Sequence, residues 1–344
     1  MDAKRSLFYW VGLDVGKKEF SAAIELSTDE RRFDIMALPC KKFNHTEKGV
    51  GEFLKWVGRT IHGLPFKIVM ETTGHYSINL CKLLQARKKG LECCIVNPYL
   101  TSNYLKSLDL PQKTDDIDAR GIARFGTERQ PKATILPSRE EEELRELSRH
   151  RDVLVKTKTA FGNRKESRSS ESVQNLNKAF IKTIEEHIAR TEKLMKKLAR
   201  QIPWVKEQME LMMSVPGVGE ITAIGLSVEI GDFKQYTRKG ISAASGLSPR
   251  LRESGTSVKS AKISKRSPGR IRQLLYLSSN NAINKIPYLS IMYDRLLAKG
   301  KTKLQVKCAC MRTLIQIIRS VVVHERPYTE ELAYQSLEKA VKWT

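Results

Sequence analysis

The chain has 344 residues, of which 40% are apolar and 29% charged, with a formal charge of +23 and an isoelectric point of about 9.8. This length and composition indicate two or three globular domains and exclude a disordered chain. So large a positive charge is hard to explain without a polyanionic partner, which leaves nucleic-acid enzymes, ribosomal proteins and proteins of membrane surfaces.

The sequence argues against a membrane protein. Its most apolar stretch, Leu314–Val323, is interrupted by Gln316, Arg319 and Ser320 and falls short of the ~18 apolar residues that a spanning helix needs. The first residues lack the architecture of a signal peptide, so we expect a cytoplasmic protein. The six cysteines have no C-x-x-C spacing and the six histidines no H-x-x-x-H pair, which argues against a zinc site or a disulfide framework.

Residues 1–130 show strands that alternate with helices after an initial meander, a pattern typical of an α/β domain. The expected strands are 8–14, 19–26, 32–38, 66–70 and 92–96, and the expected helices are 46–61, 77–89 and one that begins after Thr114. The helix at 46–61 is predicted from apolar residues at helical spacing on one face.

Acidic residues stand at the ends of two of these strands and at the start of a helix. Asp14 and Glu71 each end an apolar strand, where an acid is costly to bury unless it binds a cation or hydrogen-bond donors. If Thr114 caps a helix, Asp115 and Asp118 share a face. Four carboxylates so placed are what a pair of Mg²⁺ ions needs, which makes Asp14, Glu71, Asp115 and Asp118 candidate metal ligands.

Each carboxylate also has an ordinary structural interpretation. An Asp in a first helical turn compensates the helix dipole, and an Asp at a strand end commonly belongs to a turn. The argument for a metal site therefore depends on the combination. Asp116 lies between Asp115 and Asp118, and so leaves open which aspartates are the ligands.

Residues 138–202 are helical and highly charged. Ser138 and Glu141 form a capping-box pattern at the start. A heptad seam then comprises Ile181, Ile184, Ile188, Thr191, Met195, Leu198 and Ile202. Two long antiparallel helices within one chain and a dimerising coiled coil would both produce this pattern.

Residues 203–328 predict a mainly helical domain, followed by a tail at 329–344. The segment 211–223 has the pattern of a helix-hairpin-helix, in which the second helix offers free N–H groups to a phosphate. Gly217 and Gly219 of its turn are therefore candidate nucleic-acid contacts. The same turn also suits a helix corner inside a core.

A strongly basic segment follows at 249–273, with Glu253 as its single acid. A solvated charged face would mix positive and negative side chains, so contact with a nucleic-acid backbone is the favoured interpretation. The candidate contacts are Arg250, Arg252, Lys259, Lys262, Lys265, Arg266 and Arg270. Ser254, next to Gly255, is a candidate nucleophile toward a phosphodiester, with nearby guanidinium groups to stabilise the developing charge.

Several blocks of the sequence resemble, in order, the insertion-sequence-110 family of transposases and the related Piv-type invertases. In the N-terminal part these blocks are Gly12–Lys17, Glu71–Tyr76, Val96–Pro98 and Lys113–Ala119, and in the C-terminal part they are Gly246–Arg250, Ser254–Gly255 and Lys262–Arg266. The likeness covers roughly residues 8–325. It departs at Arg266–Gly269, because many members have a glycine directly after the basic residue.

The resemblance implies a ribonuclease-H-like (RuvC-like) DEDD domain at 1–130, a helical coiled-coil region at 138–202 and a DNA-binding transposase domain at 203–328. It implies that Asp14, Glu71, Asp115 and Asp118 hold Mg²⁺, as two ions for which Mn²⁺ can substitute, and that Ser254 joins covalently to DNA.

The implied function is that of a transposase or site-specific recombinase. Its implied partners are donor and target DNA, a noncoding guide (bridge) RNA, and further copies of itself in a dimer or tetramer. Two alternatives are a RuvC-like nuclease that uses metal-activated water and a non-catalytic nucleic-acid-binding protein.

Overall fold

The computed structural model describes residues 8–26, 34–108, 114–163, 170–252, 260–263 and 267–331. The chain divides into two compact units, Met1–Leu136 and Pro137–Thr344, which are described separately. None of the helices in these described ranges combines the length and the apolar character that crossing a membrane requires.

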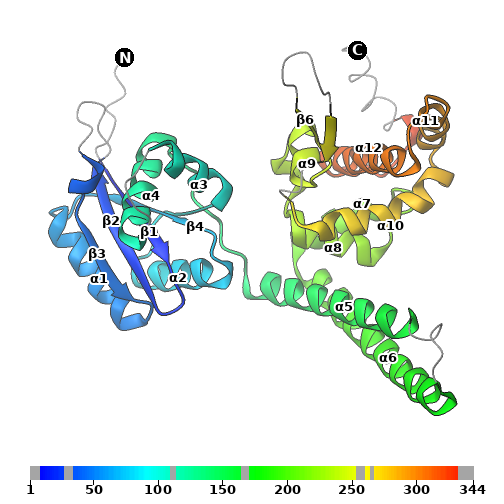
Figure 1. Cartoon of the computed structure of the whole chain (residues 1–344), viewed down its shortest axis with the longest axis horizontal. Coiled ribbons are helices and arrows are strands. Elements are labelled where there is room, and N and C mark those ends of the chain that lie inside the picture. The colour runs from blue at the N-terminus through cyan, green and yellow to red at the C-terminus, as the bar shows by residue number, and fades with distance from the viewer. Residues whose placement is uncertain are drawn as a thin grey trace. The chain divides into compact units, whose positions relative to one another are not determined.

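The N-terminal unit is built on a five-stranded sheet in the order β3-β2-β1-β4-β5 (Figure 1). Its strands are β1 (Tyr9–Val15), β2 (Glu19–Leu26), β3 (Cys40–Asn44), β4 (Phe66–Glu71) and β5 (Cys93–Val96). Its helices are α1 (Glu47–Thr60), α2 (Gly74–Arg87), α3 (Pro98–Ser107) and α4 (Asp115–Arg129). The first three strands form an antiparallel meander, and β4 and β5 add parallel to β1. This mixed α/β arrangement fits the expected ribonuclease-H-like domain.

Two elements differ from the sequence prediction. The third strand was expected at 32–38, but residues 34–38 contain the short 3-10 helix η1 (Ile35–Ala37), and the strand lies at Cys40–Asn44. The Asp34 side chain accepts a hydrogen bond from Met36 N and so caps this turn locally. Helix α3 was not predicted, although Asn97 caps it and Pro98 occupies its first position.

Helices cover both faces of the sheet. Val11 and Leu13 of β1 pack with Phe53 of α1 and Leu80 of α2 on one face. The other face belongs to α3 and α4, where Trp10 packs in a cluster with residues of both helices. Alternate residues of β1 thus enter different cores, and Asp14 is on the α4 side.

Helix α4 lies against the backbone of β1 at Gly12. A Cβ added at Gly12 would lie 2.1 Å from Ala123 N and 2.4 Å from Ala119 O, both on α4. Cβ atoms do not approach backbone so closely, so this crossing requires glycine at residue 12.

The C-terminal unit is almost entirely helical. Its helices are α5 (Arg139–Asn163), α6 (Glu171–Gln201), α7 (Pro203–Met213), α8 (Glu220–Ile230), η3 (Phe233–Gln235), α9 (Arg238–Ala244), α10 (Gly269–Lys285), α11 (Pro287–Ala298) and α12 (Lys303–Val323). Strands β6 (Pro249–Arg252) and β7 (Ser260–Ile263) pair antiparallel. Most of the core residues come from α7, α8, α10 and α12.

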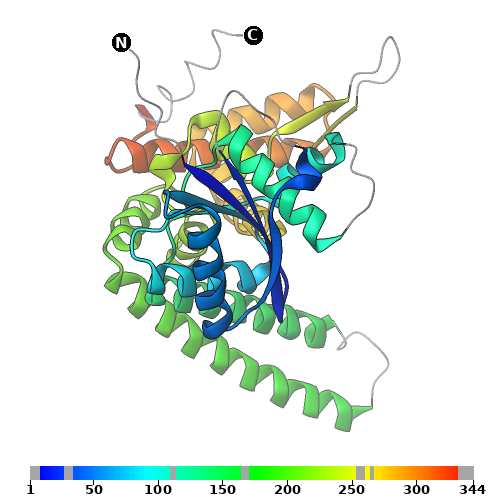
Figure 2. The same ribbon diagram turned by 90° about the vertical axis from the view of Figure 1, so that its left-hand side faces the viewer.

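The heptad seam packs within the chain. Helices α5 and α6 lie side by side as an antiparallel pair (Figures 1 and 2). Ile184, Thr191 and Met195 of the seam are buried. The capping box at Ser138 is confirmed, because Glu141 N donates to Ser138 Oγ at 3.1 Å and Ser138 N donates to Glu141 Oε2 at 2.8 Å.

We expect Gly12→Ala to lower the free energy of unfolding of the N-terminal unit by about 3 kcal/mol, because the methyl group meets backbone that cannot rotate away. Urea unfolding of the whole chain, followed by tryptophan fluorescence, measures this. The matched control is Gly58→Ala on α1, where an added Cβ meets nothing within 4 Å. The control should be neutral or stabilising by up to about 1 kcal/mol. A fully stable Gly12→Ala protein would contradict the close contact of α4 with β1.

Candidate active site

Asp14 and Glu71 end the two central parallel strands side by side. In the register of β1 and β4, Gly12 lies opposite Val69, and Asp14 and Glu71 each follow two residues later. Since alternate residues of a strand share a face and Gly12 faces α4, both carboxylates project toward the α4 side. The two acids that the sequence places at strand ends therefore lie at the same edge of the sheet.

The first turn of α4 carries aspartates that bind different strands. Lys42 Nζ, on β3, donates to Asp115 Oδ2 at 3.3 Å and to Glu19 Oε1 at 3.2 Å. Ser21 Oγ, on β2, donates to Asp116 Oδ1 at 2.7 Å. Asp116 is therefore held by the antiparallel part of the sheet, while Asp115 already binds a cation, the ammonium group of Lys42.

Asp118 lies on the opposite side of α4 from Asp116, because residues two apart on a helix point in nearly opposite directions. It shares a helix side with Ile122 and Phe125, which follow at i+4 and i+7. Both of these residues pack with Val69 of β4. Asp118 is thus on the side of β4, the strand that ends in Glu71.

Further contacts fix the surroundings of these acids. Thr101 Oγ1, on α3, donates to Glu71 Oε1. A buried ion pair between Arg124 and Glu25 holds α4 to β2. Across the described ranges of the chain, no three Asp, Glu, His or Cys residues are close enough to hold a metal ion as they stand. As their side chains lie, Asp14, Glu71, Asp115 and Asp118 do not form such a group.

Two side chains beside the acids have shifted pKa values. Hydrogen bonds to Glu19 and Asp115 raise the pKa of Lys42, so its ammonium group stays charged. Burial, followed by the charge of Asp116, raises the pKa of Cys40 to about 11. The Cys40 thiol therefore stays protonated at neutral pH and is no nucleophile.

The two glycines of the helix-hairpin-helix pattern have different surroundings. Gly217 has a φ of 92°, and a Cβ there would lie 2.7 Å from Ala282 N and 2.8 Å from Ser278 O of α10. Gly217 therefore serves the packing of the turn against α10. Gly219 caps α8 without a side-chain hydrogen bond, and a Cβ there would meet nothing within 4 Å. Of the two glycines, only Gly219 leaves room for a side chain, and the next residue, Glu220, pairs with Lys196 and Arg200.

The basic segment forms a hairpin whose two strands are described and whose connection is not. Arg250 pairs in register with Lys262, and Arg252 pairs with Ser260. The candidate nucleophile and three of the candidate contacts lie outside the described residues. These are Ser254, Lys259, Lys265 and Arg266.

Arg270 has a structural role that the sequence prediction missed. Its Nε lies 2.6 Å from Asp152 Oδ2, its Nη1 3.0 Å from Glu229 Oε1 and its Nη2 2.6 Å from Ser148 Oγ. The side chain is only 13% exposed. Its guanidinium ties α10 to α5 and α8, an internal role beside the phosphate contact expected from the sequence. Sequence could not show this, because Asp152 lies more than a hundred residues away.

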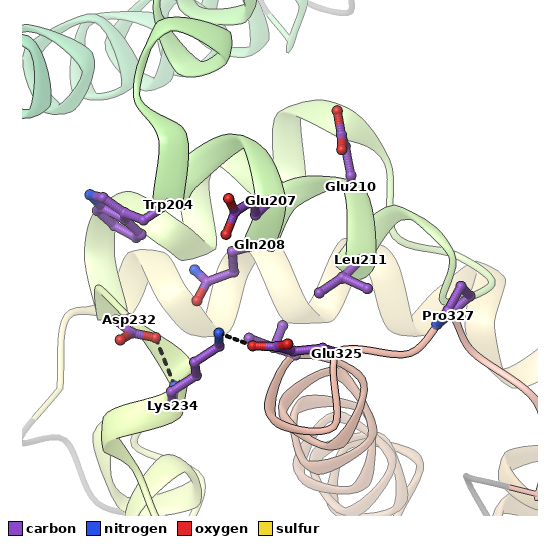
Figure 3. A pocket seen from close by; sticks show the side chains of 10 residues that line it. Trp204, Glu207, Gln208, Glu210, Leu211, Asp232, Lys234, Glu325 and Pro327 are labelled. Carbon is purple, nitrogen blue, oxygen red and sulfur yellow. Dashed lines mark hydrogen bonds and ion pairs between the residues drawn. The ribbon is translucent and has the colours of Figure 1, made fainter.

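A cavity of about 580 Å³ opens in the C-terminal unit beside α7 (Figure 3). Its lining includes Glu207, Glu210, Asp232 and Glu325, and Lys234 Nζ forms an ion pair with Glu325. It contains none of the candidate residues. An acidic lining in so basic a protein was not predicted from the sequence.

Both units match models of transposase families. Residues 11–167 match a family model described as a transposase of the DEDD, IS110 type, and residues 209–293 match one described as a transposase of the IS116/IS110/IS902 family. Together the two segments contain every candidate residue.

Two relatives illustrate the likeness. The pilin gene-inverting protein of Moraxella bovis is 25% identical over 331 residues, which cover 94% of this chain and 98% of that protein. The transposase for insertion sequence element IS1111A of Coxiella burnetii is 27% identical over 219 residues, which cover 54% of this chain and 58% of that protein.

We expect Arg270→Met to lower the free energy of unfolding of the C-terminal unit by about 3 kcal/mol, because Asp152 and Glu229 lose the cation between them in a mostly buried place. Urea unfolding measures the loss, and Lys239→Met, at an exposed position of α9, is the control that should show none. The salt dependence of DNA binding should stay unchanged in Arg270→Met. If the slope of log binding constant against log salt concentration fell by about one unit, Arg270 would instead be a phosphate contact.

Proposed function

Because the chain belongs to the IS110 family of transposases, we propose that it cuts and rejoins DNA with a carboxylate site in the N-terminal unit and a serine in the C-terminal unit. The carboxylates are Asp14, Glu71, Asp115 and Asp118, and the serine is Ser254. The observation that carries the proposal is the adjacency of Asp14 and Glu71 on parallel strands, beneath the helix whose first turn supplies the other two acids.

The four carboxylates would hold divalent cations, which we take to be two Mg²⁺ ions that Mn²⁺ can replace. Their hard oxygen donors suit such ions. The contact between Lys42 and Asp115 supports the assignment, since it places a cationic group against one of the four carboxylates. When bound, divalent ions polarise a phosphate oxygen and neutralise the charge that develops on it. Asp115 would exchange Lys42 for the metal.

Ser254 would be the nucleophile. Its Oγ forms a bond to a DNA phosphorus, one P–O bond to a deoxyribose breaks, and the leaving oxygen takes up a proton as the serine gives one up. Rejoining reverses this exchange when the hydroxyl of another DNA end attacks the phosphoserine, so no outside energy source is needed. Support comes from its position between β6 and β7, in a segment whose cations stabilise the charge of the reacting phosphate.

The proposed substrates are donor and target DNA, and the proposed partners are a structured guide (bridge) RNA and further copies of the chain. The family resemblance and the charge of +23 support the RNA, since a basic surface suits RNA and DNA alike. Exposed apolar side chains on α6, outside the buried seam, support a dimer or tetramer. They are Val173, Leu176, Phe180 and Leu194.

Asp14→Asn and Glu71→Gln should each lower strand cleavage at least about a hundredfold, because the site loses charge but no volume. Ser254→Ala should bind DNA but form no covalent protein–DNA adduct. Both effects are measured on a plasmid that carries the ends of the insertion element from which the protein comes. The plasmid is analysed for nicks and for DNA linked to protein. The matched control is Asp116→Asn, which keeps an acceptor for Ser21 and should retain activity. Cleavage by Ser254→Ala without any adduct would support a water-using nuclease, and full activity of Asp14→Asn would refute the carboxylate site.

The serine and the acids should come from different subunits. The acids and the serine belong to different units, and the antiparallel pair α5 (25 residues) and α6 (31 residues) lies between them along the chain. Mixing Asp14→Asn protein with Ser254→Ala protein should therefore recover part of the recombination activity, since some mixed assemblies contain one intact composite site. Absence of recovery, with both proteins folded and co-assembled, would place serine and acids in one subunit.

A further inference from the structure

Helix α10 exposes one continuous stripe along its length. Its exposed residues recur at helical spacing and are Gln273, Tyr276, Leu277, Asn280, Asn281, Asn284 and Lys285. Tyr276 is 42% and Leu277 56% exposed, four of the others are amides, and none is acidic. The exposed face of α6 mixes Lys, Arg and Glu, as an ordinary solvated helix does. The stripe on α10 has instead the composition of a binding surface.

The neighbouring helix α12 adds positive charge beside this stripe. Helices α10 and α12 pack against each other (Figure 1). Lys307 Nζ lies 4.6 Å from the centroid of the Tyr276 ring, and Lys303 is one turn away on the same side of α12. Neither Gly269–Lys285 nor Lys303–Val323 contains an Asp or Glu. The combined face therefore attracts anions without an internal counter-charge.

We propose that this face of α10 and α12 binds an unpaired nucleic-acid strand. Its phosphates would lie on Lys303 and Lys307, one base would stack on Tyr276, and the amides of the stripe would bond base edges. Amide side chains both donate and accept, as base edges do, and stacking on an aromatic ring is the usual means of binding single strands. The inference takes from the proposed function only that the partner is a nucleic acid. It involves neither the carboxylates nor Ser254.

The geometry favours an unpaired strand over the other possible occupants. Helix α10 packs its apolar side on the core and is flanked by α12, so its exposed side and that of α12 form one shared face. A duplex also keeps its bases stacked on one another and away from Tyr276. A second copy of the chain would bring Lys303 and Lys307 against their own counterparts, which repel.

The experiment uses the full-length chain in EDTA, so that cleavage plays no part. A single strand of DNA or RNA that contains 5-iodouracil is bound, irradiated and digested with trypsin. The peptide 273–285 follows Arg272, ends at Lys285 and contains Tyr276 as its one aromatic residue. We expect the crosslink in this peptide with either single strand and none there with the matching duplex.

Binding of variants gives a second readout. Tyr276→Ala should weaken single-strand binding about tenfold without changing its salt dependence, because stacking carries no charge. Lys303→Ala with Lys307→Ala should lower the salt slope by about 1.4, since each lysine accounts for about 0.7 on a single strand. Ile291→Ala, at a 63%-exposed apolar position of α11, is the matched control and should bind like the parent chain.

Three outcomes would overturn the proposal. One is a crosslink map that omits peptide 273–285, and another is an equal loss of duplex and single-strand binding in Tyr276→Ala. The third is a Tyr276→Ala protein that changes oligomeric state but not affinity, which would identify the face as a contact between copies. None of these depends on Asp14 or Ser254, so the proposed catalytic function can fail while this inference stands, and the reverse.

Discussion

The N-terminal unit depends on the contact of α4 with the backbone of β1 at Gly12. Because residue 12 has no side chain, the helix comes down onto the sheet, with Ala119 and Ala123 against the strand. The buried pair of Arg124 and Glu25 fixes the rotation of the helix, since separating the two would leave a charge without a partner in the interior. Helix position and rotation together determine which aspartates face β4 and which face β2.

A comparable anchor exists in the C-terminal unit. Arg270 opens α10 and binds α5 and α8, and just before it Ser267 Oγ donates to Ala243 O of α9 at 3.1 Å. Arg272 Nη1 donates back to Ser267 O at 3.1 Å. These contacts fix the start of α10 against α5, α8 and α9.

The sequence was most informative where a local rule decides the structure. Apolar runs and Thr114 as a cap sufficed for β1, β4 and α4 and for the positions of Asp14 and Glu71 near strand ends, while the pairing of β1 with β4 was not predicted. The third strand was misplaced because Asp34 caps the short helix η1 within the predicted range. Contacts between distant segments were out of reach, because the charge of Arg270 looks the same in the sequence whether it meets a phosphate or a buried acid.

The acidic cavity beside α7 has a consequence for how the protein meets its partners. Glu207, Glu210 and Asp232 line it, and the Lys234 ammonium is matched by Glu325, so this region of a chain of charge +23 repels phosphate. Charges act on an approaching polyanion over a Debye length, about 8–10 Å at ordinary salt. A polyanion that is repelled at this cavity and attracted to basic surfaces elsewhere would experience a torque. A polyanion that approaches the C-terminal unit would therefore be turned away from this cavity, which would favour encounters through other faces of the unit.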